Sequence, residues 1–257
     1  MSLTPTNVDH HVDAVRLLVQ PPIDAKADRI HLQEFFNRAS EDQPRLFDTL
    51  AQQPGLFEIK KQVVIPGKGR VEVATFFLTQ QGPVLSFPRR LPFMPDEVPW
   101  SDKPLTEEIV RCLKTLCSCH PTWKYLQVTK RREVIFGTQS ENSSEMIRRR
   151  FAPGVPSGTQ QVGVRWTDGD DMYDRKVTVS AVERKNVIRE DVGGLEYRRE
   201  ELTKEYGVQV VLEVSNRKLK AMEPEELSII LDHADSYYNE TLLKVIVDSG
   251  ARHGKPE

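Results

Sequence analysis

Residues 57–87 constrain the fold more than any other part of the chain. The segment FEIKKQVVIPGKGRVEVATFFLTQQGPVLSF is rich in β-branched and aromatic residues, and turn signals interrupt it at PGKG (66–69) and QGP (81–83). Such runs, separated by short turns that contain Gly and Pro, are typical of antiparallel strands joined as hairpins. The sequence therefore predicts three antiparallel strands in this region.

The other segments predict helices and further strands around this sheet. Residues 12–19 predict a strand that Pro21 and Pro22 end, which favours an edge or terminal position. Apolar residues at helical spacing predict helices over 28–40, 104–119, 140–151 and 224–247, and RLFDTLAQQ (45–53) predicts another turn or two of helix. Further strands are predicted over 125–137, 159–166, 175–184 and 207–219.

The order of these elements indicates an α+β protein in which helices cover antiparallel, curved sheets. Both halves of the chain run strand, helix, antiparallel strands, helix, which predicts two similar strand-helix-strands halves. The proline-rich segment RRLPFMPDEVPWSDKP (89–104) would connect them. We expect an N-terminal α+β half over 1–100, a C-terminal α+β half over 101–250 that ends in a long amphipathic helix, and a tail over 251–257.

Composition argues against several classes of protein. A formal net charge of -2 over 257 residues gives no overall attraction to nucleic acid or acidic membranes. The apolar runs are too short for a transmembrane helix, and the first residues lack the features of a signal peptide. The three cysteines are clustered in one short segment and make no disulfide framework. We therefore expect a cytoplasmic protein with no membrane partner.

The segment RCLKTLCSCHP (111–121), which holds all three cysteines, is the most suggestive of a metal site. On a helix, Cys112 and Cys119 would continue the apolar face, and they would lie about 10 Å apart along the axis. Two ligands of one zinc ion cannot be so far apart, since each Zn–S bond is about 2.3 Å long. Only Cys117 and His120, at positions i and i+3, are weak candidates to share a metal. A buried helix face is favoured, and we expect no cofactor.

Two other segments carry motif-like patterns. TDGDDMYD (167–174) spaces four aspartates somewhat as a calcium loop does, but its glycine is misplaced for an EF-hand and the distal Glu is absent. A hairpin turn is favoured there, and likewise at PGKG, which lacks the full spacing of a phosphate-binding loop. No recognisable catalytic motif is present, and His233 is interpreted as a boundary residue of the last helix. We therefore predict no catalytic residues, although an enzyme with an unrecognised site stays open.

Basic residues are concentrated in the segment 124–150. The candidates for contacts with nucleic acid phosphates are Lys130, Arg131, Arg132, Arg148, Arg149 and Arg150. The alternative is that these charges are solvated, or pair with acidic residues of the last helix within the fold. Side chains alternate along a strand, so Lys130 and Arg132 would point one way and Arg131 the other, which divides the cluster.

The order of elements and the ending VVLEVSNRKL…LSIILDHADSYYNETLLKVI resemble a sporadically distributed, uncharacterised bacterial family of about this length. In that family a late strand is followed by an acidic stretch and a terminal amphipathic helix, and a mid-chain strand comparable to YLQVTKRREVIFG precedes them. The glycine- and asparagine-containing mid-chain strand of the family is not clearly reproduced here. The resemblance implies no activity and no site residues. A patchy distribution would suit an accessory of a bacterial defence or mobile-element operon.

The function that the sequence favours is that of a non-catalytic binding or adaptor protein with a protein partner. Phe93 and Trp100 lie in the proline-rich connector, and an exposed segment of that kind suits contact with a partner. Packing of the connector over a sheet is the alternative. A nucleic-acid-binding protein that uses the segment 124–150 is the second hypothesis, and the sequence leaves the oligomeric state open.

Overall fold

The structure is a computed structural model of the 257-residue chain. It describes residues 8–24, 29–41, 47–53, 56–65, 69–79, 81–90, 105–120, 122–138, 143–157, 161–192 and 195–247.

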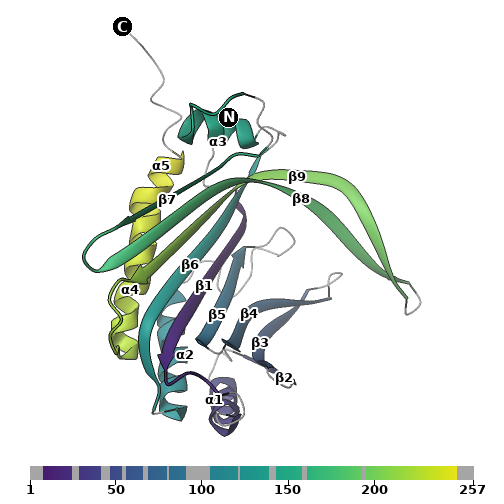
Figure 1. The fold of residues 1–257 in the computed structure, drawn as a ribbon. Helices are drawn as coiled ribbons and strands as arrows, with labels where there is room; N and C mark the ends of the chain where they lie inside the picture. Colours follow the sequence, from purple (N-terminus) through teal and green to yellow (C-terminus); the bar gives the residue numbers. More distant parts are fainter. Residues whose placement is uncertain are drawn as a thin grey trace.

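Nine strands of these residues form one continuous antiparallel sheet in the order β2-β3-β4-β5-β1-β6-β9-β8-β7 (Figure 1). The strands are β1 (Val8–Gln20), β2 (Thr49–Gln53), β3 (Leu56–Ile65), β4 (Gly69–Thr79), β5 (Gly82–Arg90), β6 (Lys124–Thr138), β7 (Gly163–Gly169), β8 (Tyr173–Val192) and β9 (Leu195–Asn216). The predicted α+β class with antiparallel pairing is confirmed, and the hairpin strands of 57–87 are β3, β4 and β5.

The position of β1 differs from the prediction of an edge or terminal strand. β1 lies at the centre of the sheet and pairs with β5 on one side and β6 on the other. Its pairing with β6 extends from Val8 to Gln20 and stops at the prolines. The prolines therefore end the strand without preventing it from pairing on both sides.

The segment RLFDTLAQQ also differs from its prediction, because its second half forms β2 and not a helix. Thr49–Gln53 pairs antiparallel with β3, and Leu50 lies opposite Ile59. Pairing with a preformed sheet edge decides the conformation of such a short segment, and it overrides local helical spacing. The last strand is longer than expected, because β9 begins at Leu195 and not near residue 207.

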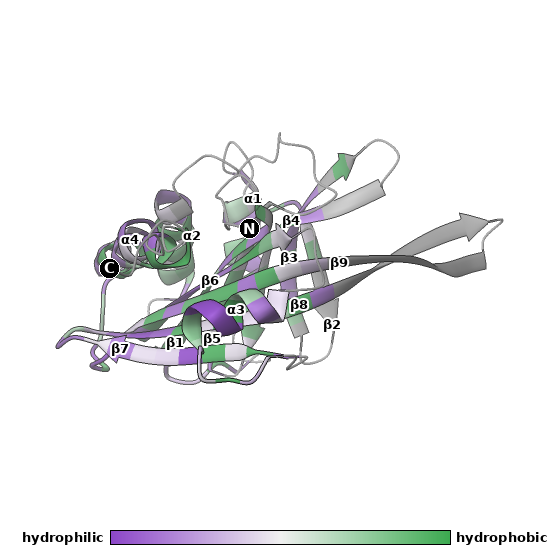
Figure 2. Cartoon of the chain, turned by 90° about the horizontal axis from the view of Figure 1, so that it is seen from above, coloured by the Kyte–Doolittle hydropathy of each residue, from purple (hydrophilic) through white to green (hydrophobic). Residues whose placement is uncertain are grey.

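The helices cover one face of the sheet (Figures 1 and 2). They are α1 (Arg29–Glu41), α2 (Leu105–Cys119), α3 (Ser143–Phe151) and a final run of α4 (Pro224–Ser236), the π-helix η2 (Tyr237–Leu242) and α5 (Leu243–Val247). α2 packs between α1 and α4, while α3 packs against β7, β8 and β9. The predicted final helix over 224–247 is confirmed, with the addition of the wider π-helical turn.

The core lies between this helical layer and the sheet. Alternate side chains of β6, such as Val128, Val134 and Phe136, are buried on the helix side. The corresponding residues of β9, Val210 and Leu212, are also buried there. Arg131 and Lys176, in contrast, both lie beside Glu213 in the register and alternate with the buried residues, so they lie on the other face. No described helix covers this face (Figure 2). The described residues thus form two layers, and the sheet face away from the described helices is called the open sheet face below.

From the centre outward, one half of the sheet runs β1, β5, β4, β3, β2 and the other half runs β6, β9, β8, β7. In each half the first strand is central, a helix follows, and the next strands start at or near the outer edge and return to the centre. The two halves differ at their edges, since β3 is covered by β2 and β7 has no described strand beyond it.

Candidate interaction site at the sheet edge

The helical layer leaves the outermost strand partly uncovered. α4 packs against β6 and β9, so β8 and β7 extend beyond it. On β7, Trp166 lies opposite the buried Val177 of β8, which places its indole on the helix side of the sheet. The ring of Phe151, at the end of α3, stacks on this indole with 6.2 Å between ring centroids.

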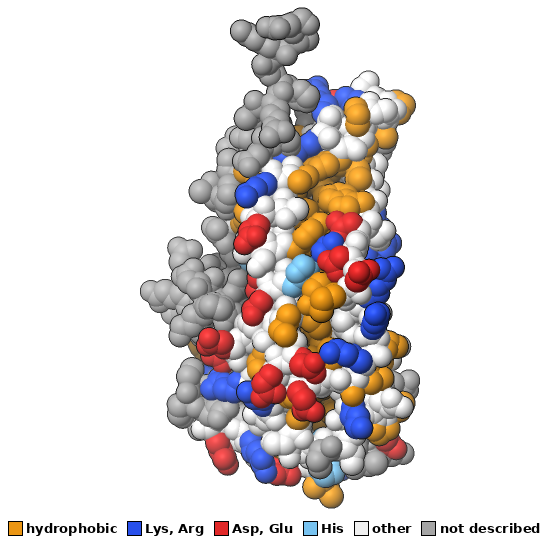
Figure 3. All heavy atoms as spheres, turned by 90° about the vertical axis from the view of Figure 1, so that its left-hand side faces the viewer, with side chains coloured by type: hydrophobic (Ala, Val, Ile, Leu, Met, Phe, Trp, Pro, Cys, Tyr) orange, Lys and Arg blue, Asp and Glu red, His pale blue; other side chains and the backbone are white. Residues whose placement is uncertain are grey.

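Aromatic and aliphatic side chains continue from this point along the boundary between β7 and the last helix. We call them the edge strip, which consists of Phe151, Val164, Trp166, Tyr173 and Tyr237. Figure 3 shows hydrophobic side chains along this side of the molecule, with a histidine and a group of charged side chains beside them. All but Tyr173 are partly exposed, and Met172 beside Tyr173 is 64% exposed.

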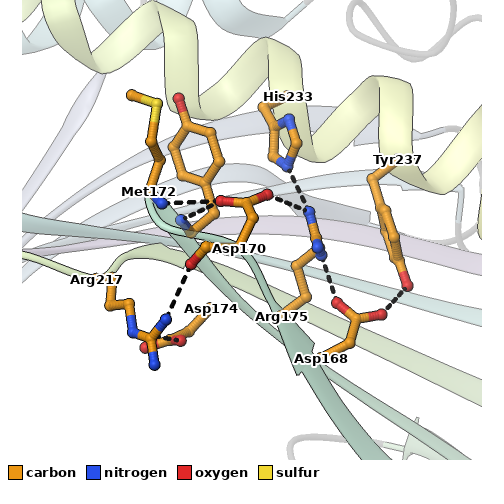
Figure 4. A network of polar contacts seen from close by, with 9 residues as sticks. Asp168, Asp170, Met172, Asp174, Arg175, Arg217, His233 and Tyr237 are labelled. Atoms are coloured by element: carbon orange, nitrogen blue, oxygen red, sulfur yellow. Dashed lines mark hydrogen bonds and ion pairs between the residues drawn. The ribbon is translucent and has the colours of Figure 1, made fainter.

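A network of charged and polar groups ties the β7–β8 hairpin to the last helix (Figure 4). Arg175 of β8 donates hydrogen bonds to Asp168 through Nε and to Asp170 through Nη1, the latter at 2.9 Å. Tyr237 of η2 donates its hydroxyl proton to the second oxygen of Asp168 at 2.7 Å. The Arg175 guanidinium also lies 4.9 Å from the centroid of the Tyr237 ring. The edge strip is therefore held to the hairpin at one end by hydrogen bonds.

His233 of α4 completes the network. Its Nε2 atom lies 3.2 Å from Arg175 Nη1, and its ring stacks on Tyr173 with 4.2 Å between centroids. Burial and the positive charge of Arg175 lower the pKa of His233, and Asp170 opposes them. The neutral imidazole is therefore favoured, and its Nε2 can accept a hydrogen bond from Arg175 Nη1.

Tyr237 is held as a neutral hydrogen-bond donor. Burial, followed by its hydrogen bond to Asp168 and the charge of that carboxylate, raises the pKa of Tyr237 to about 12. The phenol thus keeps its proton near neutral pH. Asp168, Arg175 and Tyr237 are thus engaged with one another.

Three aspartates of the hairpin tip, Asp168, Asp170 and Asp174, are engaged by the turn or by arginines. Asp170 accepts hydrogen bonds from the backbone N–H groups of Met172 and Tyr173 at 2.9 and 2.8 Å, and these bonds lower its pKa. Asp174 lies 3.7 Å from Arg217. The favoured hairpin turn is confirmed, and the described residues contain no group of three or more potential metal ligands.

The cysteine segment forms the helix that the sequence predicts. Cys112 and Cys119 are buried in α2, and Cys117 is half-buried. His120, just after the helix, is buried against Trp123, with 4.0 Å between ring centroids, and its Nδ1 lies 3.1 Å from Thr122 Oγ1. Packing thus accounts for Cys112 and Cys119, and the weak Cys117–His120 metal candidate belongs to no group of three ligands in the described part of the chain.

Lys130 and Arg132 lie in the core and not on a phosphate-binding surface. They are 2% and 5% exposed, respectively. Lys130 Nζ lies 2.6 Å from Asp235 of α4, and Arg132 pairs with both Asp13 and Asp235. Contact of these two side chains with nucleic acid would require the fold to open. For Lys130 and Arg132, the alternative that basic residues of 124–150 pair with acidic residues of the last helix is therefore correct.

The other four basic candidates do not form one surface with them. Arg131 points to the open sheet face and pairs with Glu133. Arg148 and Arg149 both pair with Glu145 of α3, and Arg150 donates a hydrogen bond to the carbonyl of Val245. The partner-binding candidates Phe93 and Trp100 lie outside the described residues.

The open sheet face carries a hollow of about 420 Å³. Arg16, Thr129, Glu213 and Lys176 line it, each from a different strand. Arg16 lies opposite Thr129 and Glu213 opposite Lys176 in the sheet register. The charged side chains of the hollow, Arg16, Asp174, Lys176 and Glu213, come from three strands, β1, β8 and β9, and carry both signs.

No member of the edge strip was predicted from the sequence, and of the polar network beside it only His233 was, as a boundary residue of the last helix. The members of the strip come from four segments that the strand order brings together. The local sequence signal for the strip is Trp166 two residues before Asp168, since both side chains lie on one face of a strand. Fold and site together define a two-layer α+β protein with an open antiparallel sheet and an aromatic edge. No protein-family model and no curated protein matches the chain. No described helix has the length and apolar character needed to cross a membrane.

Proposed function

We propose that this chain is a non-catalytic binding protein that acts through a protein partner, and that the partner contacts the edge strip. The observation that carries the proposal is the row of partly exposed aromatic side chains, Phe151, Trp166 and Tyr237, at the edge of the sheet. Aromatic residues and Met are enriched in the centres of protein interfaces, and Trp and Tyr dominate their binding energy.

The charge network supports the proposal because it fixes the strip before any partner arrives. Asp168 accepts from both Arg175 and Tyr237, which holds the phenol in one orientation. A side chain that is already ordered loses little conformational entropy on binding. Such preorganisation favours a specific contact over transient apolar association.

The second hypothesis, nucleic acid binding, has less support. Lys130 and Arg132 are buried in ion pairs, and Arg148 and Arg149 share Glu145. The remaining basic candidates are too few and too separated to follow a phosphate backbone.

The proposal is tested by affinity capture with matched variants. The immobilised full chain, Trp166→Ala and Ile30→Ala would be incubated with extract of the source cells; Ile30 is an exposed apolar residue of α1, 78% exposed. We expect a protein that the parent chain and Ile30→Ala capture and that Trp166→Ala loses. Equal capture by all three chains, or no capture beyond empty beads, would contradict the proposal.

We also propose that the chain consists of two similar strand-helix-strands halves. The shared strand order supports this, since β1, β5, β4 and β3 correspond in sequence and position to β6, β9, β8 and β7. Because β1 pairs antiparallel with β6, an approximate two-fold axis through the centre of the sheet would relate the two halves. In this correspondence β7 matches β3 and α2 matches α4, so α2 would belong to the first half and the division would fall after Cys119 and not after residue 100 as expected.

A further inference from the structure

The outer edge of β7 presents a row of backbone groups for strand pairing. Asp170 N donates to Tyr173 O at 3.0 Å, and Ala181 N donates to Val162 O at 3.3 Å. Both bonds belong to the register in which Gly163 lies opposite Ser180. In this register the even-numbered residues of β7 form the hydrogen-bonded pairs with β8. Because such pairs alternate along an antiparallel ladder, Gly163, Arg165, Thr167 and Gly169 direct their N–H and C=O groups away from β8.

The other half of the chain shows what can fill this position. β3 corresponds to β7, and the outer edge of β3 is covered by the five-residue strand β2. In the second half, the described residues between α3 and β7 form no strand. The edge of β7 is thus a place where the fold accepts one more strand and where this chain supplies none among its described residues.

We propose that an extended segment of a partner protein adds to β7 as a further strand, in the place that β2 takes on β3. This inference rests on the proposed function and specifies how the partner binds. Main-chain hydrogen bonds to Arg165 and Thr167 supply affinity in such an arrangement, and alternate side chains supply specificity.

The side chains of the helix-facing side define the chemistry of the segment. A residue of the segment opposite Trp166 would lie against the edge strip, which favours a large apolar side chain. Two positions along, on the same face, the segment passes Asp168, because side chains on one face of a strand are two residues apart. An apolar residue and a basic residue separated by one position would fit this face.

Charge at the hairpin tip favours the basic residue. The tip carries the four carboxylates of Asp168, Asp170, Asp171 and Asp174, and two guanidinium groups, of Arg175 and Arg217, pair with it. Asp171 is exposed and has no partner among the residues that the structure describes. The excess of negative charge attracts Lys or Arg at this end of the added strand.

The test is a selection of phage-displayed nine-residue random peptides on the immobilised full chain. Enriched peptides would be synthesised, labelled with fluorescein and titrated with protein variants by fluorescence anisotropy. We expect enrichment of Lys or Arg followed, after one position, by an apolar residue, because the added strand would run antiparallel to β7 as β2 does to β3. Absence of enriched sequences, or enrichment without such a pattern, would overturn the inference.

Two substitutions at one site separate strand addition from side-chain contact. Thr167→Pro removes an outward N–H that β8 does not use, which an edge strand tolerates, while Thr167→Ala keeps this N–H. We expect Thr167→Pro to weaken peptide binding by about ten-fold or more, because it removes a hydrogen-bond donor and its ring projects toward the added strand. Thr167→Ala should weaken binding by less than about two-fold. Circular dichroism of both variants checks that the fold is retained.

Other results distinguish the ways in which the inference can fail. If Trp166→Ala abolishes binding of the selected peptide and Thr167→Pro does not, the strip binds partners without strand addition; the inference is then wrong and the proposed function stands. If neither variant changes binding, both are wrong. If sedimentation shows a dimer of the parent chain that Thr167→Pro dissociates, the occupant is a second copy and not a partner segment.

Discussion

Arg132 and Asp13 form a bidentate ion pair inside the core, directly opposite each other on β6 and β1. Arg132 Nε lies 2.7 Å from Asp13 Oδ1, and Nη2 lies 3.0 Å from Oδ2. Asp235 of α4 accepts a further hydrogen bond from Arg132 at 2.7 Å and one from Lys130 at 2.6 Å. Two cations and two anions thus join the central strands to the last helix.

Removal of the Asp13 carboxylate should strongly destabilise the fold. Asp13→Ala leaves the buried Arg132 guanidinium with only the partly exposed Asp235, and loss of one partner of a buried pair typically costs about 3–5 kcal/mol. Urea unfolding followed by circular dichroism measures the change. As a control, Glu34→Ala breaks the exposed Arg38–Glu34 pair of α1 and should change the unfolding free energy by less than about 1 kcal/mol. Equal effects of the two variants would contradict the role assigned to the buried pair.

The buried pair also shows what the sequence could and could not predict. Alternation along 125–137 correctly separates Arg131 from Lys130 and Arg132, because strand geometry is local. It does not say which of the two faces is covered, since this depends on the helices that pack there. The inward-facing Asp13 on 12–19 is also a feature of edge strands, where inward charges oppose unwanted pairing. Here the charge is satisfied by Arg132 of the neighbouring strand, so β1 can be central.

The contribution of Asp13 to stability should disappear in acid. Burial disfavours the ionised carboxylate, but hydrogen bonds from His11 and Arg132 together with the charge of Arg132 hold the pKa of Asp13 well below its usual value. A carboxyl with a depressed folded-state pKa stabilises the fold above its unfolded-state pKa, about 3.9, and the stabilisation is lost as the pH falls below it. The difference in unfolding free energy between the parent chain and Asp13→Asn should therefore shrink from pH 6 to pH 3. A constant difference over this range would show that the ionised state of Asp13 does not matter.

His233 should make the fold less stable as the pH falls below neutral. Its pKa is lowered by burial and by Arg175, so the unfolded chain takes up a proton more readily than the folded one. For such a group stability is highest above the unfolded-state pKa of about 6.5 and decreases as the pH falls through this value toward the folded-state pKa. Urea unfolding at pH 7.5 and pH 5.5 should show a larger loss for the parent chain than for His233→Gln, which cannot be protonated in this range. An imidazole titration by NMR with a midpoint above 6.5 would contradict this expectation.

The edge strip illustrates a second limit of sequence interpretation. β7 lies between β6 and β8 in the chain, but it is the outermost strand of the sheet. Hydrophobic patterns predict a hairpin over β7 and β8, and they do not give the order in which hairpins join. Trp166 and Tyr237 come together only because β9 pairs with β6 and leaves β7 outside. Contacts between distant segments of this kind follow from the strand order, which propensities do not specify.

Gly82 should tolerate no side chain, because it lies where the β4–β5 turn approaches β1. A Cβ atom at this position would be 1.9 Å from the backbone oxygen of Leu17, and the φ angle of +154° is one that residues with a side chain rarely adopt. The turn is held to β1 by the hydrogen bond from Val19 N to Gln81 O at 3.0 Å, so it cannot move away without loss of that bond. We expect Gly82→Ala to lower the unfolding free energy by more than about 2 kcal/mol, as measured by urea unfolding.

Gly154→Ala is the matched control: no atom lies within 4 Å of its Cβ position, and the change should be within about 0.5 kcal/mol. Wild-type stability of Gly82→Ala would mean that β5 docks on β1 less closely than the structure shows.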